Sequence, residues 1–452
     1  MDNGNVIEFT NYTVNQKGRI TMSHFKYCLA GLLLFIFVLA EPVLAIQKTV
    51  PILLNDLKIA YQTKKFDDAI AAGLELIKLE PDNEEGNLFL ARAYYEKLNF
   101  AESGKYFRKS LELTVNQKDK HNKINAEYLS HFGVKMKEVG ELIYSATPDN
   151  PPADFKSNYP AAKIILDQMV AYKPDSPRVF FWLFLCANGL LPDNPTEADQ
   201  ENITSIIRKA VNMQQDLLNA LKANPTTDPK ILAAEQATLK QYQAALLPTL
   251  LQSDKYLEEV DQLSRQIIAQ DPDKIAVLVP FVLALQSEKY SEATGMMPDI
   301  IAKFPILKDD MDLIKGLIND KKYDDAKNEA LGEISSYHLA LTTLGRALFT
   351  KAQNLSETDE KKAKEVFIEA NTYLEKASQL DPRDDSIKRI LGFSLYMAGD
   401  YQRAADILES FYKADPKGTE SGIISAIYEC YVQLKNQAKI SEYEKILEER
   451  YK

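Results

Sequence analysis

Cysteine, tryptophan and glycine are scarce in this chain of 452 residues. It has three Cys and one Trp, and its 17 Gly fall well below the usual share of about 7%. So few Gly disfavours a β-rich or loop-rich chain, and three Cys cannot build a disulfide framework. Basic residues are not in excess either, because 54 Lys and Arg face 65 Asp and Glu, for a net charge of −11. This balance argues against nucleic-acid binding, which needs Lys and Arg to neutralise phosphates.

The N-terminal segment has the three-part layout of a secretory signal peptide. Within residues 22–45, Lys26 supplies a positive charge, Leu29–Ala40 is apolar, and Val43–Ala45 ends in the small residues of a cleavage site. We expect cleavage between Ala45 and Ile46, and export to the periplasm or cell envelope of a bacterium, or secretion. The alternative is an uncleaved anchor, which would be the chain's only membrane contact. Residues 1–21 do not fit this layout, so we hypothesise that Met22 is the true start and that they are an N-terminal extension.

Beyond residue 45 the chain is helical in pattern and repeats every 33–34 residues. Pro382 and Pro416 are 34 apart, each after Asp, and Tyr290 and Tyr323 are 33 apart. An aromatic residue followed three residues later by Ala recurs at Phe66/Ala69, Tyr159/Ala162, Tyr290/Ala293, Tyr323/Ala326 and Tyr401/Ala404. Twelve residues after four of these Ala stand Pro81, Pro174, Pro305 and Pro416. Pro ends a helix because it lacks an N–H donor and disfavours α conformation in the preceding residue.

With the large–small pairs Leu90–Ala91 and Leu391–Gly392, this pattern resembles the tetratricopeptide repeat (TPR), a helix–turn–helix unit. The resemblance implies an all-α fold, a right-handed α-solenoid of about ten helical pairs. We expect the pairs to begin near Pro51, Glu84, His121, Pro177, Pro229, Ile275, Leu307, Tyr337, Asp385 and Thr419. They are expected to form an N-terminal solenoid over residues 46–273 and a C-terminal one over 274–452. Insertions are expected between the helices of pairs 3, 4 and 8, at Ala146–Asn158, Leu191–Glu197 and Asn354–Glu360.

TPR arrays present the first helix of each pair on a groove that holds a segment of another protein. Projecting the family pattern places seven residues on that face, which are Arg92, Tyr95, Glu96, Arg346, Arg389, Phe393 and Tyr396. Arg and aromatic residues often dominate binding, although several of these could instead pack on the next pair. The family's Lys/Asn clamp for a C-terminal carboxylate is missing from pairs 1 and 2, which disfavours binding of chaperone tails.

The segment Val179–Leu185 is apolar on every side, so it must be covered on every side. Either the Ala146–Asn158 insertion folds over it, which we favour, or a partner does.

Signals for chemistry are weak. His121, His131 and His338 belong to no zinc-binding pattern, and we expect surface or capping roles for them. Cys186 and Cys430 are expected to be buried free thiols, because pairs 4 and 10 of a solenoid should not touch. No phosphate-binding loop or nucleophile motif occurs, and we expect no catalytic residue, no metal and no cofactor.

The sequence thus predicts a non-enzymatic scaffold or adaptor of the bacterial envelope that binds protein partners and no nucleic acid. Two alternatives remain: an accessory or glycan-binding component of a polysaccharide or surface-structure assembly system, and a secreted effector. The partner's identity and the oligomeric state do not follow from the sequence.

Overall fold

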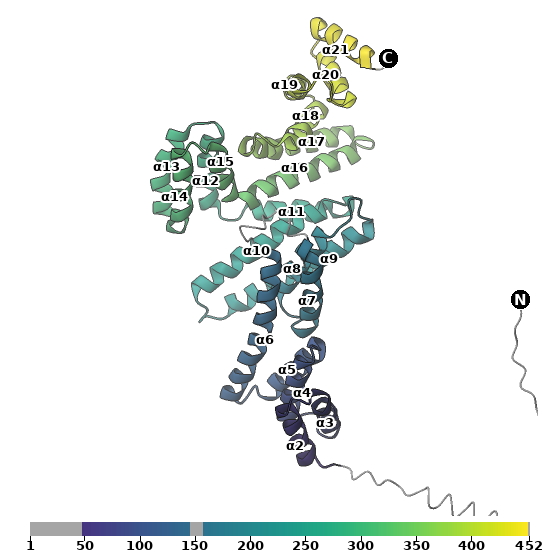
Figure 1. The fold of residues 1–452 in the computed structure, drawn as a ribbon. Helices are drawn as coiled ribbons and strands as arrows, with labels where there is room; N and C mark the ends of the chain where they lie inside the picture. Colours follow the sequence, from purple (N-terminus) through teal and green to yellow (C-terminus); the bar gives the residue numbers. More distant parts are fainter. Residues whose placement is uncertain (1–47, 145–156, 451–452) are drawn as a thin grey trace, which may run out of the picture. The chain divides into compact units, whose positions relative to one another are not determined.

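The computed structural model describes residues 48–144 and 157–450 (Figure 1), which form twenty α-helices and two short 3₁₀ helices and contain no strand. The chain divides into two compact units, the first ending at Ala93 and the second starting at Tyr94. The boundary falls inside α4, and the boundary expected from the sequence between residues 273 and 274 falls in the first turn of α12. The expected signal peptide and its cleavage site at Ala45 and Ile46 lie outside the described residues.

The helices follow one another with short connections. The first ten are α2 (Val50–Gln62), α3 (Phe66–Leu79), α4 (Glu84–Glu96), α5 (Phe100–Leu113), α6 (Lys118–Tyr144), α7 (Tyr159–Tyr172), α8 (Pro177–Gly189), α9 (Glu197–Ala223), α10 (Pro229–Leu250) and α11 (Leu257–Ile268). The other ten are α12 (Pro272–Gln286), α13 (Tyr290–Lys303), α14 (Lys308–Asn319), α15 (Tyr323–Gly332), α16 (Ser335–Ser356), α17 (Glu360–Leu380), α18 (Asp385–Ala398), α19 (Tyr401–Ala414), α20 (Ser421–Gln433) and α21 (Gln437–Arg450). The 3₁₀ helices are η2 (Asp254–Tyr256) and η3 (Pro305–Leu307).

The expected helical pairs are confirmed. Taken two at a time, the helices make ten pairs, and each first helix begins within three residues of its predicted start. The fold is therefore all-α, an α-solenoid of helical repeats. The third insertion is corrected: most of Asn354–Glu360 extends α16 and starts α17, and only residues 357–359 connect them.

The residue types of the repeat have the packing that their sizes predict. The five Ala of the aromatic–Ala pattern, at 69, 162, 293, 326 and 404, are all 0% exposed. Gly345 and Gly392 allow close approach, since a Cβ there would lie 2.6 Å and 2.7 Å from Leu374 and Leu408 side-chain atoms. Pro81, Pro174, Pro305 and Pro416 each stand two residues beyond the end of a helix. The repeat aromatics Tyr290 and Tyr323 stack on each other with ring centroids 4.1 Å apart.

The first unit is a small helical assembly of α2, α3 and most of α4. Leu53 and Leu57 of α2 pack with Ala69 and Leu76 of α3. Lys64 lies in the α2–α3 turn with φ near +60°. The same left-handed turn geometry recurs in several other pairs, where Gly399 is the one glycine that adopts it among the described residues.

In the second unit, α5 and α7 approach each other very closely. Gly104 of α5 faces the end of α7, and a Cβ at Gly104 would lie 2.2 Å from the carbonyl oxygen of Tyr172. That oxygen accepts hydrogen bonds from Arg108 and, at 2.9 Å, from the Tyr128 hydroxyl of α6. Three helices thus meet at one carbonyl, with the Tyr128 and Tyr172 rings stacked 4.9 Å apart.

The apolar helix α8 is covered within the protein. Val179, Phe181 and Phe184 are buried, α7 and α9 pack against α8, and the Phe181 ring stacks on Tyr242 of α10 at 4.2 Å. Neighbouring helices thus cover much of α8, whereas the insertion that we expected to cover it, Ala146–Asn158, lies outside the described residues except for its last two residues. Cys186 of α8 and Cys430 of α20 are both buried, as predicted.

The order of the helices in space departs from a simple stack at α12–α15. Helix α11 packs directly on α16, so the chain leaves the stack after α11 and rejoins it four helices later (Figure 1). Helix α16 serves both neighbours: Ala340 and Ala347 join the core of α8–α11, whereas Leu341, Leu344 and Leu348 join the core shared with α17. We call α12–α15 the branch.

A buried carboxylate joins the last helices. Glu409 of α19 is 5% exposed and accepts hydrogen bonds from the hydroxyls of Tyr431 at 2.9 Å and Tyr443 at 3.0 Å. The Glu409 carboxylate also forms ion pairs with the ammonium groups of Lys413, at 2.6 Å, and Lys439, at 3.1 Å. The C-terminal helix α21 buries Tyr443 and packs Ile440, Ile446 and Leu447 on the same core. Among the described helices, none is long and apolar enough to cross a membrane.

Candidate partner-binding face

The first helices of the last three pairs are neighbours in the second unit. Helix α18 contacts both α16 and α20, and two polar contacts connect them. Arg346 of α16 donates a hydrogen bond to the Ser386 hydroxyl of α18. Arg389 of α18 pairs at 2.8 Å with Glu420, the residue just before α20. We call the surface carrying Arg346, Arg389, Phe393 and Tyr396 the first-helix face.

The three predicted residues of α18 differ in exposure. Arg389 is exposed, and its guanidinium also lies 5.9 Å from the centre of the Phe411 ring, so two neighbours hold it in place. Phe393 and Tyr396 are half-buried and pack on the C-terminal core. Tyr396 meets the Tyr401 ring edge-on at 6.0 Å, and burial raises the pKa of its hydroxyl. Neighbouring residues therefore hold Arg389, Phe393 and Tyr396 in place, and each of the three side chains still has solvent-accessible surface that a partner could contact.

The predicted residues of α4 have different surroundings. Arg92 lies 5.2 Å from the centre of the Phe89 ring within the first unit. In the second unit, Tyr95 stacks on the ring of His131 at 3.8 Å and meets Phe100 edge-on at 5.5 Å. Tyr95 therefore packs on the next pair, the alternative that the sequence left open for each residue. Glu96 is exposed at the end of α4.

The histidines serve packing and capping. His121 Nδ1 lies 3.2 Å from the Leu111 carbonyl oxygen near the end of α5, which agrees with a capping role. His338 Nε2 lies 3.2 Å from the Ala377 carbonyl oxygen, and burial lowers the pKa of its ring. The expected surface or capping role is wrong for His131, because its ring is sandwiched against Tyr95 and the edge of Phe107. Within residues 48–144 and 157–450, no cluster of His, Cys, Asp and Glu could hold a metal ion.

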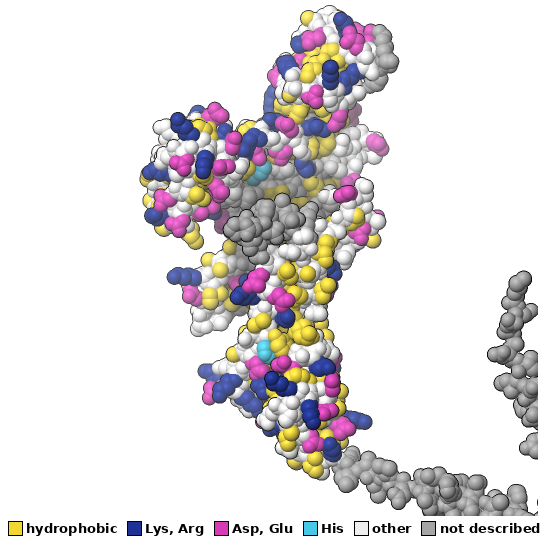
Figure 2. All heavy atoms as spheres, viewed as in Figure 1, with side chains coloured by type: hydrophobic (Ala, Val, Ile, Leu, Met, Phe, Trp, Pro, Cys, Tyr) yellow, Lys and Arg dark blue, Asp and Glu magenta, His cyan; other side chains and the backbone are white. Residues whose placement is uncertain are grey.

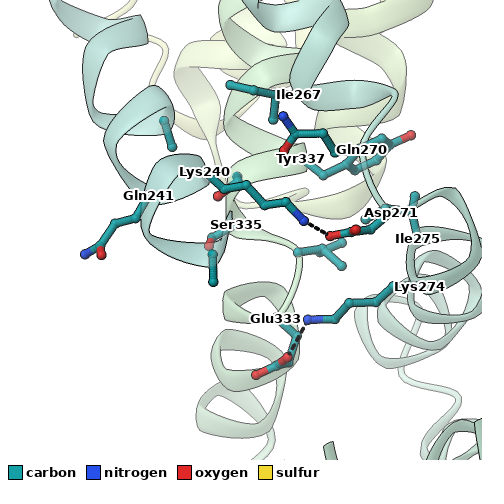
Figure 3. A pocket seen from close by; sticks show the side chains of 14 residues that line it. Lys240, Gln241, Ile267, Gln270, Asp271, Lys274, Ile275, Glu333, Ser335 and Tyr337 are labelled. Atoms are coloured by element: carbon teal, nitrogen blue, oxygen red, sulfur yellow. Dashed lines mark hydrogen bonds and ion pairs between the residues drawn. The ribbon is translucent and has the colours of Figure 1, made fainter. Parts of the chain in front are cut away.

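A cavity of about 480 Å³ lies where the branch leaves and rejoins the stack (Figure 3). Lys240 of α10 reaches Asp271, the residue before α12, and Lys274 of α12 pairs with Glu333 at 3.2 Å. The lining also includes Gln270, Ser335 and Tyr337, above an apolar floor formed by α10, α11 and α12. These ion pairs connect the two ends of the branch to each other and to the stack. We call this space the branch cavity.

The charges on the visible surface are mixed. Figure 2 shows Lys and Arg interspersed with Asp and Glu over the helices, with no large area of one sign on that side. Exposed ion pairs within a single helix include Lys163–Asp167 and Lys308–Asp312. Such a surface carries no extended basic track for a phosphate backbone.

Comparison with known protein families identifies two segments of the sequence that match a repeat family. Residues 58–115 and 367–419 match the sequence profile of the tetratricopeptide repeat. These two segments resemble TPR units. The second includes α18 and α19, so Arg389, Phe393 and Tyr396 lie inside it. No curated protein matches the chain.

Several solved helical proteins align along most of the chain, at low similarity. An assembly chaperone of RpL4 (Acl4, residues 1–338) is 10% identical with a TM-score of 0.25, over 87% of this chain and 100% of that one. The TPR domain of P58(IPK) is 12% identical with a TM-score of 0.21, over 86% and 99%. Yeast Tom70 is 14% identical with a TM-score of 0.17, over 86% and 96%. TM-scores this low do not establish a shared arrangement of helices.

Sequence reasoning missed two sites that are built from distant segments. The branch cavity combines residues of α10, α11–α12 and α15–α16, and no short motif marks it. Glu409 is preceded and followed by ordinary helical residues, and only the pattern of burial shows that this carboxylate faces inward.

Proposed function

We propose that this protein is a non-enzymatic scaffold or adaptor that binds a segment of a partner protein on its first-helix face. The observation that carries the proposal is the arrangement on α18, where Arg389, Phe393 and Tyr396 follow one another at i, i+4 and i+7 and keep accessible surface. Arg and aromatic side chains held in place by neighbours lose little entropy on binding, so they suit a binding site. Helical-repeat folds of this kind are typically non-catalytic.

We further propose export to a bacterial cell envelope, on the basis of the signal-like residues 22–45. The exported protein should begin at Ile46. Intact-mass and N-terminal peptide analysis of protein recovered from the periplasm or medium of the expressing bacterium checks this. Material that retains residues 25–44 and sediments with membranes would replace cleavage with anchoring.

Replacing Arg389 or Phe393 by Ala should weaken binding of a partner captured from envelope extract. Each substitution should make the free energy of binding less favourable by about 1 kcal/mol or more, which corresponds to a five-fold or larger rise in Kd. Arg389→Ala should leave the melting temperature almost unchanged, because an exposed ion pair contributes little stability. Titration calorimetry with the purified partner measures both variants.

The controls are Arg403→Ala and Ile407→Ala on α19, which match the two test residues in charge and in partial burial. Both controls should leave the Kd unchanged. If Phe393→Ala costs several kcal/mol of stability, the residue belongs to the core and the projection of the face is wrong. If neither test variant changes binding or stability, the first-helix face is not the site.

The branch cavity favours glycan binding as a second candidate function. Its hydroxyl, amide and carboxylate groups can hydrogen-bond to sugar hydroxyls, and its volume of about 480 Å³ is that of a small-ligand site. Retention on immobilised envelope polysaccharide, with no protein partner captured, would favour this function over the scaffold.

A further inference from the structure

The guanidinium of Arg346 is partly buried but has few hydrogen-bond acceptors around it. Its side chain is half-buried, and one terminal nitrogen donates to the neutral hydroxyl of Ser386. Its Nε is buried and has no hydrogen-bond acceptor within the described part of the chain. No carboxylate of the described residues lies within ion-pair distance of it, in contrast to Arg389 with Glu420 and Arg403 with Glu375.

A guanidinium has five N–H donors, and a partly desolvated one normally finds an anionic acceptor. The buried Nε has no accessible surface and stays out of reach of a ligand, so a docking acceptor would bond the terminal nitrogens, of which one hydrogen bond, to Ser386, is already made. The missing group at Arg346 is therefore an acceptor for its terminal N–H groups, because the guanidinium itself has no ion pair within the described residues.

We propose that Arg346 is a subsite for a carboxylate side chain, an Asp or Glu within the partner segment that docks on the first-helix face. This inference rests on the proposed function and specifies its partner. A single carboxylate fits better than a phosphate dianion, because Arg389 is already neutralised by Glu420, and Asp384 and Asp385 stand beside Ser386. The unpaired charge of Arg346 balances one negative charge.

The geometry of α18 also sets a spacing. Arg346 bonds to Ser386 in the first turn of α18, and Phe393 follows seven residues later, about 10 Å along the helix at 1.5 Å per residue. An extended segment covers that length in about three residues. We therefore expect an acidic residue about three positions from an apolar residue that contacts Phe393.

The test uses the mature chain and fluorescein-labelled octapeptide pools with random flanks, amidated C-termini and a fixed Leu. Three residues from the Leu, the pools carry Glu, Gln or phosphoserine, and a further Gln pool has a free C-terminal carboxylate. Fluorescence anisotropy should show the Glu pool binding at least five-fold tighter than every other pool. R346Q should abolish this preference, and the control R403Q, which removes a guanidinium that already has carboxylate partners, should keep it.

Other results would overturn the inference. Equal binding of Glu and Gln pools rejects the carboxylate subsite, yet the proposed face survives if F393A weakens both pools alike. Tightest binding of the phosphoserine pool, or of the free C-terminus, assigns Arg346 to that group and rejects a side-chain carboxylate. Binding that no variant of α16 or α18 alters, or no binding by any pool, contradicts both the subsite and the face.

A second measurement needs no peptide. Because the unpaired guanidinium is a liability in the free protein, R346M should melt at the same temperature as the wild type or higher. A melting temperature several degrees lower would show that Arg346 is there to support the packing of α16 on α18. That outcome would overturn the inference even if peptide binding were also lost.

Discussion

Gly104→Ala should destabilise the second unit by about 3 kcal/mol, although the change adds only one methyl group. Ala is the better helix former by up to about 1 kcal/mol, so the penalty comes from packing. The new Cβ would lie 2.2 Å from the Tyr172 carbonyl oxygen and 2.6 Å from its Cα, and neither backbone atom can rotate away. Helices α5 and α7 must then separate, which weakens the hydrogen bonds of Arg108 and Tyr128 to that carbonyl.

The matched control for this change is Gly133→Ala in α6. Nothing lies within 4 Å of a Cβ at Gly133, so the same substitution there should stabilise by about 0.5–1 kcal/mol. Urea denaturation followed by circular dichroism compares the two variants, and hydrogen exchange in α5–α7 locates the loss. Two variants with equal stability would mean that α5 and α7 are not in close contact at Gly104.

Glu409→Gln should loosen the C-terminal helices and remove an acid-sensitive part of the protein's stability. Burial alone would raise the pKa of Glu409, but hydrogen bonds from Lys413, Tyr431, Lys439 and Tyr443 outweigh it and lower the pKa to about 2. A carboxylate whose pKa is lower in the folded state contributes stability above its unfolded pKa of 4.5. That contribution, about 3 kcal/mol, is lost progressively as the pH falls from about 4.5 to about 2.

The measurement is the melting temperature, with hydrogen exchange in α20 and α21, at pH values from 7 to 3. Wild type should lose stability faster than Glu409→Gln below about pH 4.5, so the gap between them should narrow with acid. Glu442→Gln is the control, because Glu442 is exposed and pairs with the same Lys439; it should cost less than 1 kcal/mol. If the difference in melting temperature between the wild type and Glu409→Gln stays constant from pH 7 to pH 3, the pKa of Glu409 is not lowered in the folded protein.

The local parts of this fold are predictable from the sequence. Each Pro that ends a helix and each buried Ala acts through its own helix and the next one, so the period of 33–34 residues reveals the pairs that keep it, and the helical pattern between them supplies the rest. The sequence predicts an insertion at Asn354–Glu360 because this segment lengthens the repeat, but Leu355 and Ser356 complete α16. Extra residues can lengthen two helices as well as separate them, and the period alone does not distinguish these outcomes.

The non-local parts are not predictable in this way. Nothing around Ile268 or Ser335 indicates that α11 and α16 pack together, since this depends on the branch closing as a unit. For the candidate site, projection of the family pattern correctly gives Arg389 an accessible position. The same projection also gives Tyr95 an accessible position, but the Tyr95 ring packs on His131, which lies 36 positions away in the sequence. Arg346 lacks an ion pair because no carboxylate of the described residues lies close enough to it. A repeat pattern in the sequence does not show which side chains lie close together in space.

The branch gives the protein a reserve of hidden length. Because α11 packs on α16, tension along the array would load that contact first and leave α12–α15 shielded. When the contact yields, the branch enters the line of force and adds up to about 3.4 Å for each residue that unravels. A second unit held at α8 and at α21, on either side of the branch, would then lengthen in one step at α12–α15.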